Sequence, residues 1–361
     1  MAAKAPKLPK GGIKPRPAVV SMAPYSPPTA GRAGKLRLDF NENTVGCSPR
    51  VIARLRECLD PCGLTVYPEY LTAKAAIARY FRVTPDQFVF TNGTDEAIQV
   101  FLNTYVDDGQ EVVILKPSYA MYRFYAEVAG ARIREVEYPR PGMEFPLQAL
   151  LDAVTPETRA VLVANPNNPT GTGVSPAGIE RILRRARKAA VLVDEAYYEF
   201  SGVTVLREIE HLPNLFVSRT FSKAFGMAAL RLGCLFSHEA NIAFLHKAQS
   251  PYSVNALAVA AAHAAVEDTG WVRDYVAEVL AARELLCAGL EKLGIAYVPS
   301  SANFVLGHFG VRALEVRDAL RGGGILVRDR SYEAPGCVRI TVGTREQTSK
   351  LLAAIEEIWR R

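Results

Sequence analysis

Short apolar runs alternate with helical patterns along most of the chain. Between residues 87 and 237, seven such runs are rich in Val, Ile, Leu and Phe. They read QFVF, EVVIL, ARIREVEY, RAVLVA, AVLVD, LFVSR and LGCLFS. Strands that are apolar at nearly every position are typical of a parallel sheet covered by helices on both faces. We therefore predict an α/β fold built on a mostly parallel seven-stranded sheet.

Helical periodicity fills the intervals between these runs. It is clearest at 94–106, 118–129 and 175–188. Before the first run, Ser48 is a favoured N-cap residue and Pro49 fits the first position of a helix. The regular alternation of strand and helix favours parallel βαβ connections.

The pattern changes near residue 250. A long helical segment at 271–294 ends at Gly294, and four short apolar runs then alternate with further helices. These features predict a second, smaller α+β domain. The predicted division is a disordered tail at 1–20, an N-terminal arm with part of the small domain at 21–47, a large domain at 48–250 and a small C-terminal domain at 251–361.

Composition narrows the class of protein. The chain has 361 residues, of which 49% are hydrophobic and 22% are charged, as in globular proteins, and no apolar run has membrane-spanning length. The first 20 residues lack the apolar core of a secretory signal. The six cysteines form no CxxC pair, so we expect reduced thiols, a cytoplasmic location and no metal site.

The net charge of +6 does not indicate nucleic-acid binding. The strongest basic run, at 181–188, has a helical spacing that leaves Ile182 and Leu183 to face the core. Such a run is typical of a solvated helix face.

Polar residues gather where the predicted strands end. Gly93, Thr94 and Asp95 connect a strand directly to a helix, which places free backbone N–H groups at the sheet edge as a site for an anion. A GxGxxG or GxxxxGK[ST] pattern is missing, so a dinucleotide-binding oxidoreductase and a P-loop protein are not favoured. The stretch LVANPNNPTGTG presents amide side chains, including Asn168, after the next buried strand.

Two charged residues are unusual in this setting. Asp194 ends a fully apolar strand, where a carboxylate needs a cationic partner, such as the protonated ring nitrogen of a cofactor. Tyr197 lies three residues on and is able to donate a hydrogen bond to the same ring. Lys223 follows another strand, and a lysine desolvated in such a crevice becomes an amine nucleophile that forms a Schiff base with an aldehyde.

Residues beside Lys223 suit a phosphate. Ser222 offers a hydroxyl and Arg231 a fixed cation. An amine, a counter-ion for a pyridinium and a phosphate site together indicate pyridoxal 5′-phosphate as the cofactor.

The sequence resembles a known family at these positions. NPNNPTG, VDEAYYEF, RTFSKAFGMAALRLG and VRITVGT are similar to motifs of the fold-type-I pyridoxal-phosphate-dependent aminotransferases, in particular the histidinol-phosphate aminotransferase branch. The resemblance covers nearly the whole chain after the first 20 residues. It implies a large cofactor-binding domain and a homodimer with shared active sites.

The resemblance also implies roles for single residues. Lys223 would form the Schiff base and move a proton between the substrate carbon and the cofactor, and Asp194 would keep the pyridine nitrogen protonated. Asn168 and Tyr197 would bond the phenolic oxygen, while Tyr119 would stack on the ring. The residues implied to hold the phosphate are Gly93, Thr94, Asp95, Thr220, Ser222 and Arg231, with Tyr67 reaching over from the neighbouring subunit.

Substrate binding is implied at the small domain. Arg339 would bind the acidic group of the substrate, with Asn168 beside it, and Arg328 and Tyr25 match positions that help to bind a substrate phosphate. The expected reaction moves an amino group between L-histidinol phosphate and 2-oxoglutarate in histidine biosynthesis.

Other functions stay open at this point. The segment NENTVGCSP has Thr44-Val45 where a proline often stands, and the loop between Arg328 and Arg339 is short. Both departures lie near the side-chain end of the pocket, so an aromatic amino-acid aminotransferase is one alternative. A threonine-phosphate decarboxylase and a non-catalytic cofactor-binding regulator are two others.

Overall fold

The structure is a computed structural model that describes residues 12–24, 29–61 and 63–360. Its larger sheet has seven strands in the order β2-β8-β7-β6-β5-β3-β4, and only β8 runs antiparallel to its neighbours. The mostly parallel seven-stranded sheet is therefore confirmed. Its strands are β2 (Phe88–Thr91), β3 (Glu111–Lys116), β4 (Arg132–Glu137), β5 (Thr158–Ala164), β6 (Ala190–Asp194), β7 (Leu215–Thr220) and β8 (Gly233–Phe236).

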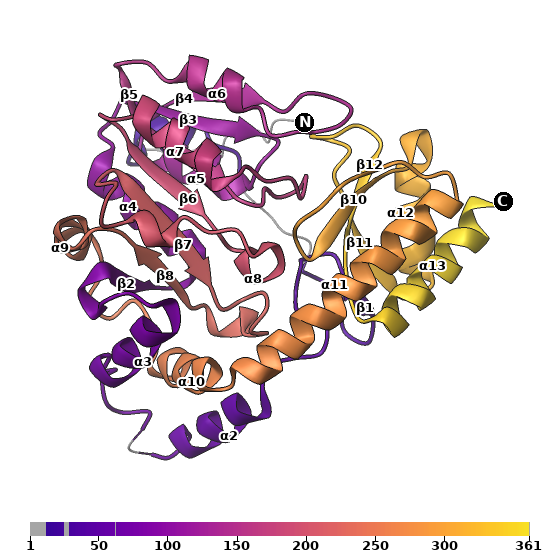
Figure 1. The fold of residues 1–361 in the computed structure, drawn as a ribbon, viewed down its shortest axis with the longest axis horizontal. Coiled ribbons are helices and arrows are strands. Elements are labelled where there is room, and N and C mark those ends of the chain that lie inside the picture. The colour runs from indigo at the N-terminus through magenta and orange to yellow at the C-terminus, as the bar shows by residue number, and fades with distance from the viewer. Residues whose placement is uncertain (1–11, 25–28, 62, 361) are drawn as a thin grey trace.

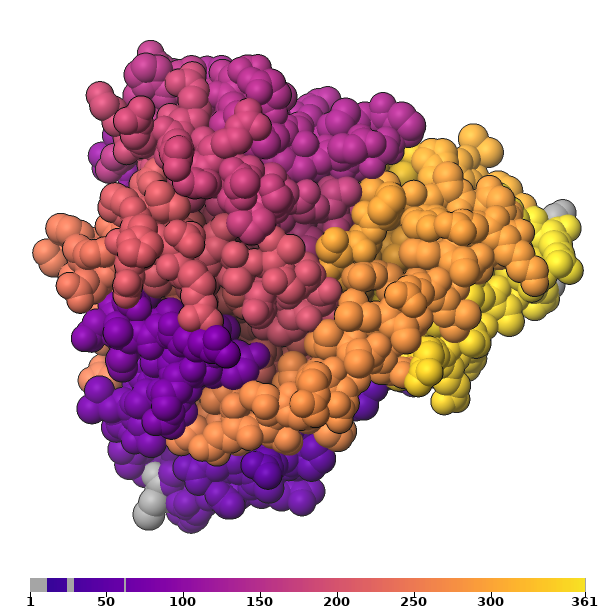
Figure 2. Space-filling view, in the orientation of Figure 1, coloured from indigo at the N-terminus to yellow at the C-terminus, as the bar shows by residue number. Residues whose placement is uncertain are grey.

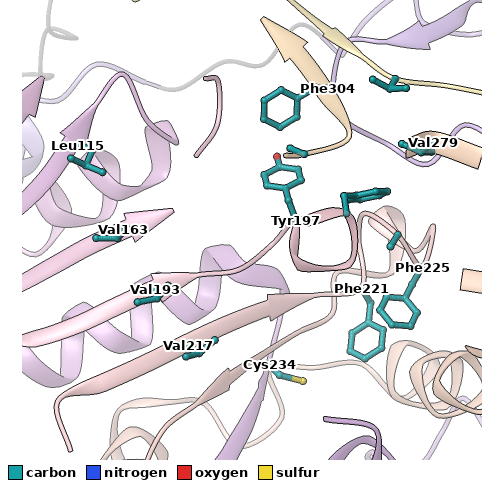
Figure 3. Packing of buried hydrophobic residues seen from close by; sticks show 14 of the residues in the cluster. Leu115, Val163, Val193, Tyr197, Val217, Phe221, Phe225, Cys234, Val279 and Phe304 are labelled. Atoms are coloured by element: carbon teal, nitrogen blue, oxygen red, sulfur yellow. The ribbon is translucent and has the colours of Figure 1, made fainter. Parts of the chain in front are cut away.

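Both faces of the sheet are buried along its inner strands, which is why β3, β5 and β6 are apolar at most positions, whereas the edge strand β4 is largely polar and partly exposed. Val163, Val193 and Val217 lie on β5, β6 and β7 and belong to one hydrophobic cluster (Figure 3), whereas Leu162 and Leu192 belong to a second cluster. The helices that accompany the sheet are α3 (Leu71–Phe81), α4 (Gly93–Tyr105), α5 (Ala120–Val128), α6 (Leu147–Ala153), α7 (Pro176–Arg185), α8 (Tyr198–Ser201) and α9 (Glu239–Ala248).

Two local predictions from the helical pattern are confirmed. Ser48 caps helix α2 (Pro49–Cys58), because its side chain accepts a hydrogen bond from the backbone N–H of Arg50. On α7, Ile182 and Leu183 are buried in the core, so the basic residues of that run lie on the outer side of the helix.

A second sheet of five strands has the order β1-β11-β12-β10-β9. Its strand β1 comes from the N-terminal part of the chain and pairs in parallel with β11. The sequence pattern missed β1 because it is only three residues long. The strands are β1 (Leu36–Leu38), β9 (Tyr297–Val298), β10 (Phe304–His308), β11 (Ile325–Asp329) and β12 (Cys337–Thr341).

Long helices accompany the second sheet on the right of Figure 1. The remaining helices are α1 (Pro17–Val20), α10 (Ala256–Glu267), α11 (Thr269–Lys292), α12 (Ala313–Gly322) and α13 (Arg345–Trp359), with short 3-10 turns η1 (Pro85–Gln87), η2 (Leu206–Glu208), η3 (Ala228–Leu230) and η4 (Gly310–Arg312). Figure 2 shows α11, in orange, crossing the surface from the lower part of the molecule toward this second part.

The predicted domain boundaries stay a prediction. Helix α10 follows the boundary at residue 250 in sequence, yet it packs on α2 and α3 beside the larger sheet. Within the described part of the chain, no helix combines the length and apolar character needed to cross a bilayer. The cytoplasmic location likewise stays a prediction.

Candidate active site

The carboxyl ends of β2, β5, β6 and β7 meet at one edge of the seven-stranded sheet. Ligands of open parallel sheets bind at this edge, and here a cavity of about 350 Å³ opens between it and the five-stranded sheet. Twelve of the residues singled out from the sequence line it. They are Thr94, Asp95, Tyr119, Asn168, Asp194, Tyr197, Thr220, Ser222, Lys223, Arg231, Arg328 and Arg339.

Lys223 lies in the turn that follows β7, is partly buried and lines the cavity. Its Nζ donates a hydrogen bond to the backbone oxygen of Phe40 at 3.1 Å. Burial, followed by the nearby Arg339, lowers the pKa of Lys223 to about 8. The uncharged amine is therefore far more available near neutral pH than on an ordinary lysine, and it is a suitable nucleophile for an aldehyde.

Asp194 is buried at the end of β6 and held by three donors. The hydroxyl of Tyr122 donates to Oδ2 at 2.8 Å, the hydroxyl of Ser218 donates to Oδ1 at 2.9 Å, and the backbone N–H of Ala196 also donates to Oδ1. Burial raises the pKa of Asp194 to about 6, although these bonds oppose the rise. Among the described residues no Lys, Arg or His forms an ion pair with it, so the site is suited to a cation brought by a ligand.

Tyr197 joins the two sheets through its hydroxyl. This oxygen accepts hydrogen bonds from Nδ2 of Asn41 at 2.9 Å and from Nδ2 of Asn168 at 3.3 Å. Its ring packs edge-on against Phe304 of β10 with the ring centroids 5.1 Å apart, and Figure 3 shows the side chain pointing toward that strand. Because the hydroxyl proton is not used in these two bonds, Tyr197 is able to donate it to a ligand oxygen.

The start of helix α4 forms a site for an anion. Gly93 has φ +74, and a Cβ at this position would come within 2.5 Å of a guanidinium nitrogen of Arg231. Glycine thus lets Arg231 lie close to the helix N-terminus, where Nη2 contacts Oδ2 of Asp95 at 3.2 Å. The hydroxyl of Thr94 is buried without a hydrogen-bond partner. A cation, an unpartnered hydroxyl and a helix N-terminus all fit a phosphate group.

Thr220 and Ser222 complete this end of the cavity. The backbone N–H of Ser222 donates to Oγ1 of Thr220 at 3.1 Å, which fixes the turn between β7 and Lys223. Tyr119 also lies here, and its hydroxyl donates to Oδ1 of Asp95 at 2.7 Å. Thr220 and Ser222 fit the predicted phosphate site, whereas Tyr119 is predicted to stack on the cofactor ring, and the roles of all three in binding stay predictions.

Tyr67 is a predicted site residue that lies away from this cavity. Tyr67 is 74% exposed and stacks on Tyr252 with the ring centroids 4.5 Å apart, so it does not line the cavity of its own chain. The expectation that it acts in a neighbouring subunit stays a prediction. Tyr25 lies outside the described residues.

Three arginines of the five-stranded sheet and its following turn, Arg328, Arg330 and Arg339, line the cavity and form a cationic wall. Arg339 of β12 is buried and donates to Oδ1 of Asn168 at 2.5 Å and to the backbone oxygen of Asp39 at 2.6 Å. Burial, followed by the neighbouring Arg330, lowers the pKa of Arg339 to about 10. Arg328 of β11 lies over the ring of Phe40, 5.5 Å from its centroid.

Several residues of the site were not predicted from the sequence. Tyr122, three residues after Tyr119 on α5, has the spacing of an ordinary buried helix face. Asn41 is held in the left-handed region, φ 56, by bonds to Thr341 and Tyr197. Arg330 lies two residues after Arg328, so in an extended strand both side chains point to the same face. This spacing was the one signal in the sequence that could have identified Arg330 as a site residue.

Comparisons with known proteins agree with this geometry. The sequence profile of the family described as aminotransferase class I and II matches residues 33–355. A histidinol-phosphate aminotransferase of Symbiobacterium thermophilum is 37% identical over 355 residues, which cover 94% of this chain and 97% of that protein.

Solved structures give the same result. The histidinol-phosphate aminotransferase of Sinorhizobium meliloti in complex with pyridoxal-5′-phosphate superposes with a TM-score of 0.85 at 26% identity, covering 95% of this chain and 97% of that one. The aspartate aminotransferase of Thermus thermophilus with maleate gives a TM-score of 0.78 at 25% identity, covering 90% and 91%.

Proposed function

Because the chain belongs to the class I and II aminotransferase family, we propose that it transfers the amino group of L-histidinol phosphate to 2-oxoglutarate with pyridoxal 5′-phosphate as cofactor. The products are imidazole acetol phosphate and glutamate, which places the reaction in histidine biosynthesis. The observation that carries the proposal is the shared cavity of Lys223, Asp194 and Arg231, a set that provides an amine, an unpaired carboxylate and a phosphate-binding cation.

The residues of the cavity fit this cofactor. When bound, pyridoxal 5′-phosphate supplies an aldehyde that exchanges amines and a ring that accepts electrons from the substrate carbon. Lys223 is the residue that would hold the aldehyde carbon. The phosphate of the cofactor would be bound by Arg231 and by the backbone at Gly93, Thr94 and Asp95. The hydroxyl of Thr94 lies at this end of the cavity and has no hydrogen-bond partner among the described residues. The side chains of Thr220 and Ser222 would complete that end, and Tyr119 would stack on the ring.

Four side chains would then control protons and orientation. Asp194, fixed by Tyr122 and Ser218, would hold a proton on the ring nitrogen of the bound cofactor. Tyr197 and Asn168 would bond its phenolic oxygen. The amine of Lys223 would accept and return a proton at Cα of the donor, and its lowered pKa suits this role near neutral pH.

The cationic wall binds the acidic groups of the substrates. Arg339 and Arg328 would bind the phosphate of the donor in one half-reaction and the carboxylates of glutamate in the other. Arg339 is already oriented by Asn168 and the backbone of Asp39, so its position costs little to organise when a substrate binds.

A comparison of two amino donors tests the proposal. Histidinol phosphate and phenylalanine are each incubated with 2-oxoglutarate, and the glutamate formed is measured, with Lys223→Ala as the inactive control. We expect a higher kcat/KM for histidinol phosphate. A preference for phenylalanine would contradict the proposal and favour an aromatic amino-acid aminotransferase.

The proposal includes a homodimer with shared active sites. Exposed apolar residues gather around the connection between α2 and α3, at the lower edge of Figure 1, and include Leu64, Val66, Tyr67 and Leu71. Apolar patches of this kind are typical of protein–protein interfaces. Association through this patch would let Tyr67 reach the phosphate site of the partner chain.

A further inference from the structure

Three arginines lie side by side on one face of the five-stranded sheet. Arg328 of β11 and Arg339 of β12 are directly paired across the two strands. Arg330 follows Arg328 by two residues, and its backbone N–H donates to the oxygen of Cys337 at 2.9 Å, so the extended pairing continues to this position. Because strand side chains alternate between faces, all three point to the same side, and all three line the cavity.

These three cations share a single carboxylate in the described part of the chain. Arg330 is 7% exposed and forms an ion pair with Glu333. Arg339 bonds only an amide oxygen and a backbone oxygen, and no ion pair of Arg328 is found among the described residues. The nearby acids do not compensate them, because Asp39 and Glu42 bind Arg32.

Two further observations point to a ligand. The Nε atoms of Arg330 and Arg339 are both buried and have no hydrogen-bond partner. Buried cationic groups without partners are costly, so a wall of this kind is suited to an anion with several acceptor atoms. The turn that follows β11 also fixes the one counter-ion, since the backbone N–H groups of Glu333 and Ala334 donate to the oxygen of Arg330 at 2.9 and 2.8 Å.

We propose that Arg330 is a third anion-binding residue of the donor site, specific for a doubly charged phosphate, and that Glu333 is the internal counter-ion which the phosphate replaces. A carboxylate carries one charge and is satisfied by Arg339. A phosphate monoester carries up to two charges and three acceptor oxygens, so it gains from a further guanidinium. Arg330 thereby favours phosphate-bearing donors over plain amino acids. The inference deepens the proposed function and rests on it.

The test uses three variants of the full-length holoenzyme. Arg330→Gln removes the cation, Glu333→Gln removes the counter-ion, and the double variant removes both, so that no buried carboxylate is left unpaired. For each, the KM and kcat are measured with histidinol phosphate and with glutamate as donors. Inorganic phosphate and acetate are compared as competitive inhibitors.

We expect Arg330→Gln and the double variant to raise KM for histidinol phosphate and Ki for inorganic phosphate about tenfold or more, as for the loss of a charge-assisted bond. The KM for glutamate and the Ki for acetate should change by less than about twofold, because their carboxylates bind Arg339 and Arg328. Glu333→Gln should lower the KM for histidinol phosphate. Equal losses for phosphate and carboxylate ligands in these variants would overturn the inference and leave Arg330 a structural residue.

Failure of the proposed function would look different. It would show in the unmodified enzyme as a poor rate with histidinol phosphate. The inhibition by inorganic phosphate would still decide the inference about Arg330, because it does not depend on the donor.

Discussion

Two cations and two anions surround Lys223, and burial decides the balance between them. Arg339 and Arg231 both lower its pKa, while Glu42 and Asp95 oppose them, and burial is the largest cause of the shift to about 8. The environment therefore favours the uncharged amine, which is the form that attacks an aldehyde. The same arginines are proposed to bind the acidic groups of cofactor and substrate, so anion binding and amine reactivity are coupled.

This coupling predicts the pH dependence of cofactor capture. Below the pKa, the fraction of uncharged amine rises about tenfold for each pH unit, so capture of pyridoxal 5′-phosphate by cofactor-free protein should accelerate up to about pH 8 and then level off. Arg339→Gln removes a cation that lowers this pKa and should move the midpoint to higher pH. The measurement is the rate of the visible absorbance change on mixing.

Arg187→Gln is the matched control, because it removes the same charge from an exposed residue in the turn after α7 that does not line the cavity. Its midpoint should equal that of the unmodified protein. If the pH midpoint of cofactor capture is unchanged in Arg339→Gln, or moves equally in both variants, then Arg339 does not lower the pKa of Lys223 and the coupling is contradicted.

The sequence predicted the charged and polar residues at strand ends but not what holds them. Lys223 and Asp194 were found because each follows an apolar run, and parallel strands bring such positions to one edge. Tyr122 and Ser218, which fix Asp194, look like ordinary core residues until the fold places them against it. Contacts between residues far apart in the chain, such as Asn41 with Tyr197, depend on tertiary packing that no local pattern contains.

At the scale of elements, the start of helix α4 is the part of the site that depends most on a glycine. Gly93 combines a positive φ with close approach to Arg231. We predict that Gly93→Ala displaces Arg231 and weakens binding of pyridoxal 5′-phosphate about tenfold or more, as for the loss of a charge-assisted bond. Equilibrium titration of the cofactor measures this loss.

Gly109→Ala provides the control for backbone strain. Gly109 has φ +78, nearly the same as Gly93, but a Cβ there would meet no atom within 4 Å. Both variants should lose roughly 1–2 kcal/mol of stability, because a side chain disfavours the left-handed region. Cofactor affinity should fall in Gly93→Ala alone. An equal fall in both variants would contradict the claim that the close approach of Arg231 to Gly93 is needed for cofactor binding.

Elements were predicted best where burial is uniform. The inner strands β3, β5 and β6 are apolar at most positions and buried, so their existence and order along the chain followed from the pattern. Strand β1 and helix α6 were missed, because each is short and only partly buried. The pairing of β1 with β11 joins segments nearly three hundred residues apart and has no local signal.

At the scale of the whole molecule, the exposed position of Tyr67 predicts activity across the subunit interface. Mixing Tyr67→Phe with an excess of Lys223→Ala should create mixed dimers that hold one intact site, made of Lys223 from one chain and Tyr67 from the other. Activity per Tyr67→Phe chain should therefore rise on mixing. The measurement is the initial rate of glutamate formation.

The control for this experiment replaces Lys223→Ala with a chain that carries both substitutions. That chain forms the same mixed dimers but cannot supply Tyr67, so activity should not rise. If the activity per Tyr67→Phe chain rises with both the Lys223→Ala chain and the doubly substituted chain, or with neither, the proposal of shared active sites is contradicted.

The central claim is that Lys223 carries the cofactor, and one measurement tests it directly. Protein incubated with pyridoxal 5′-phosphate is treated with borohydride, digested, and its peptides are identified by mass spectrometry. The account predicts a single pyridoxyl modification on the peptide that contains Lys223. A modification on another lysine, or no modification at all, would contradict it.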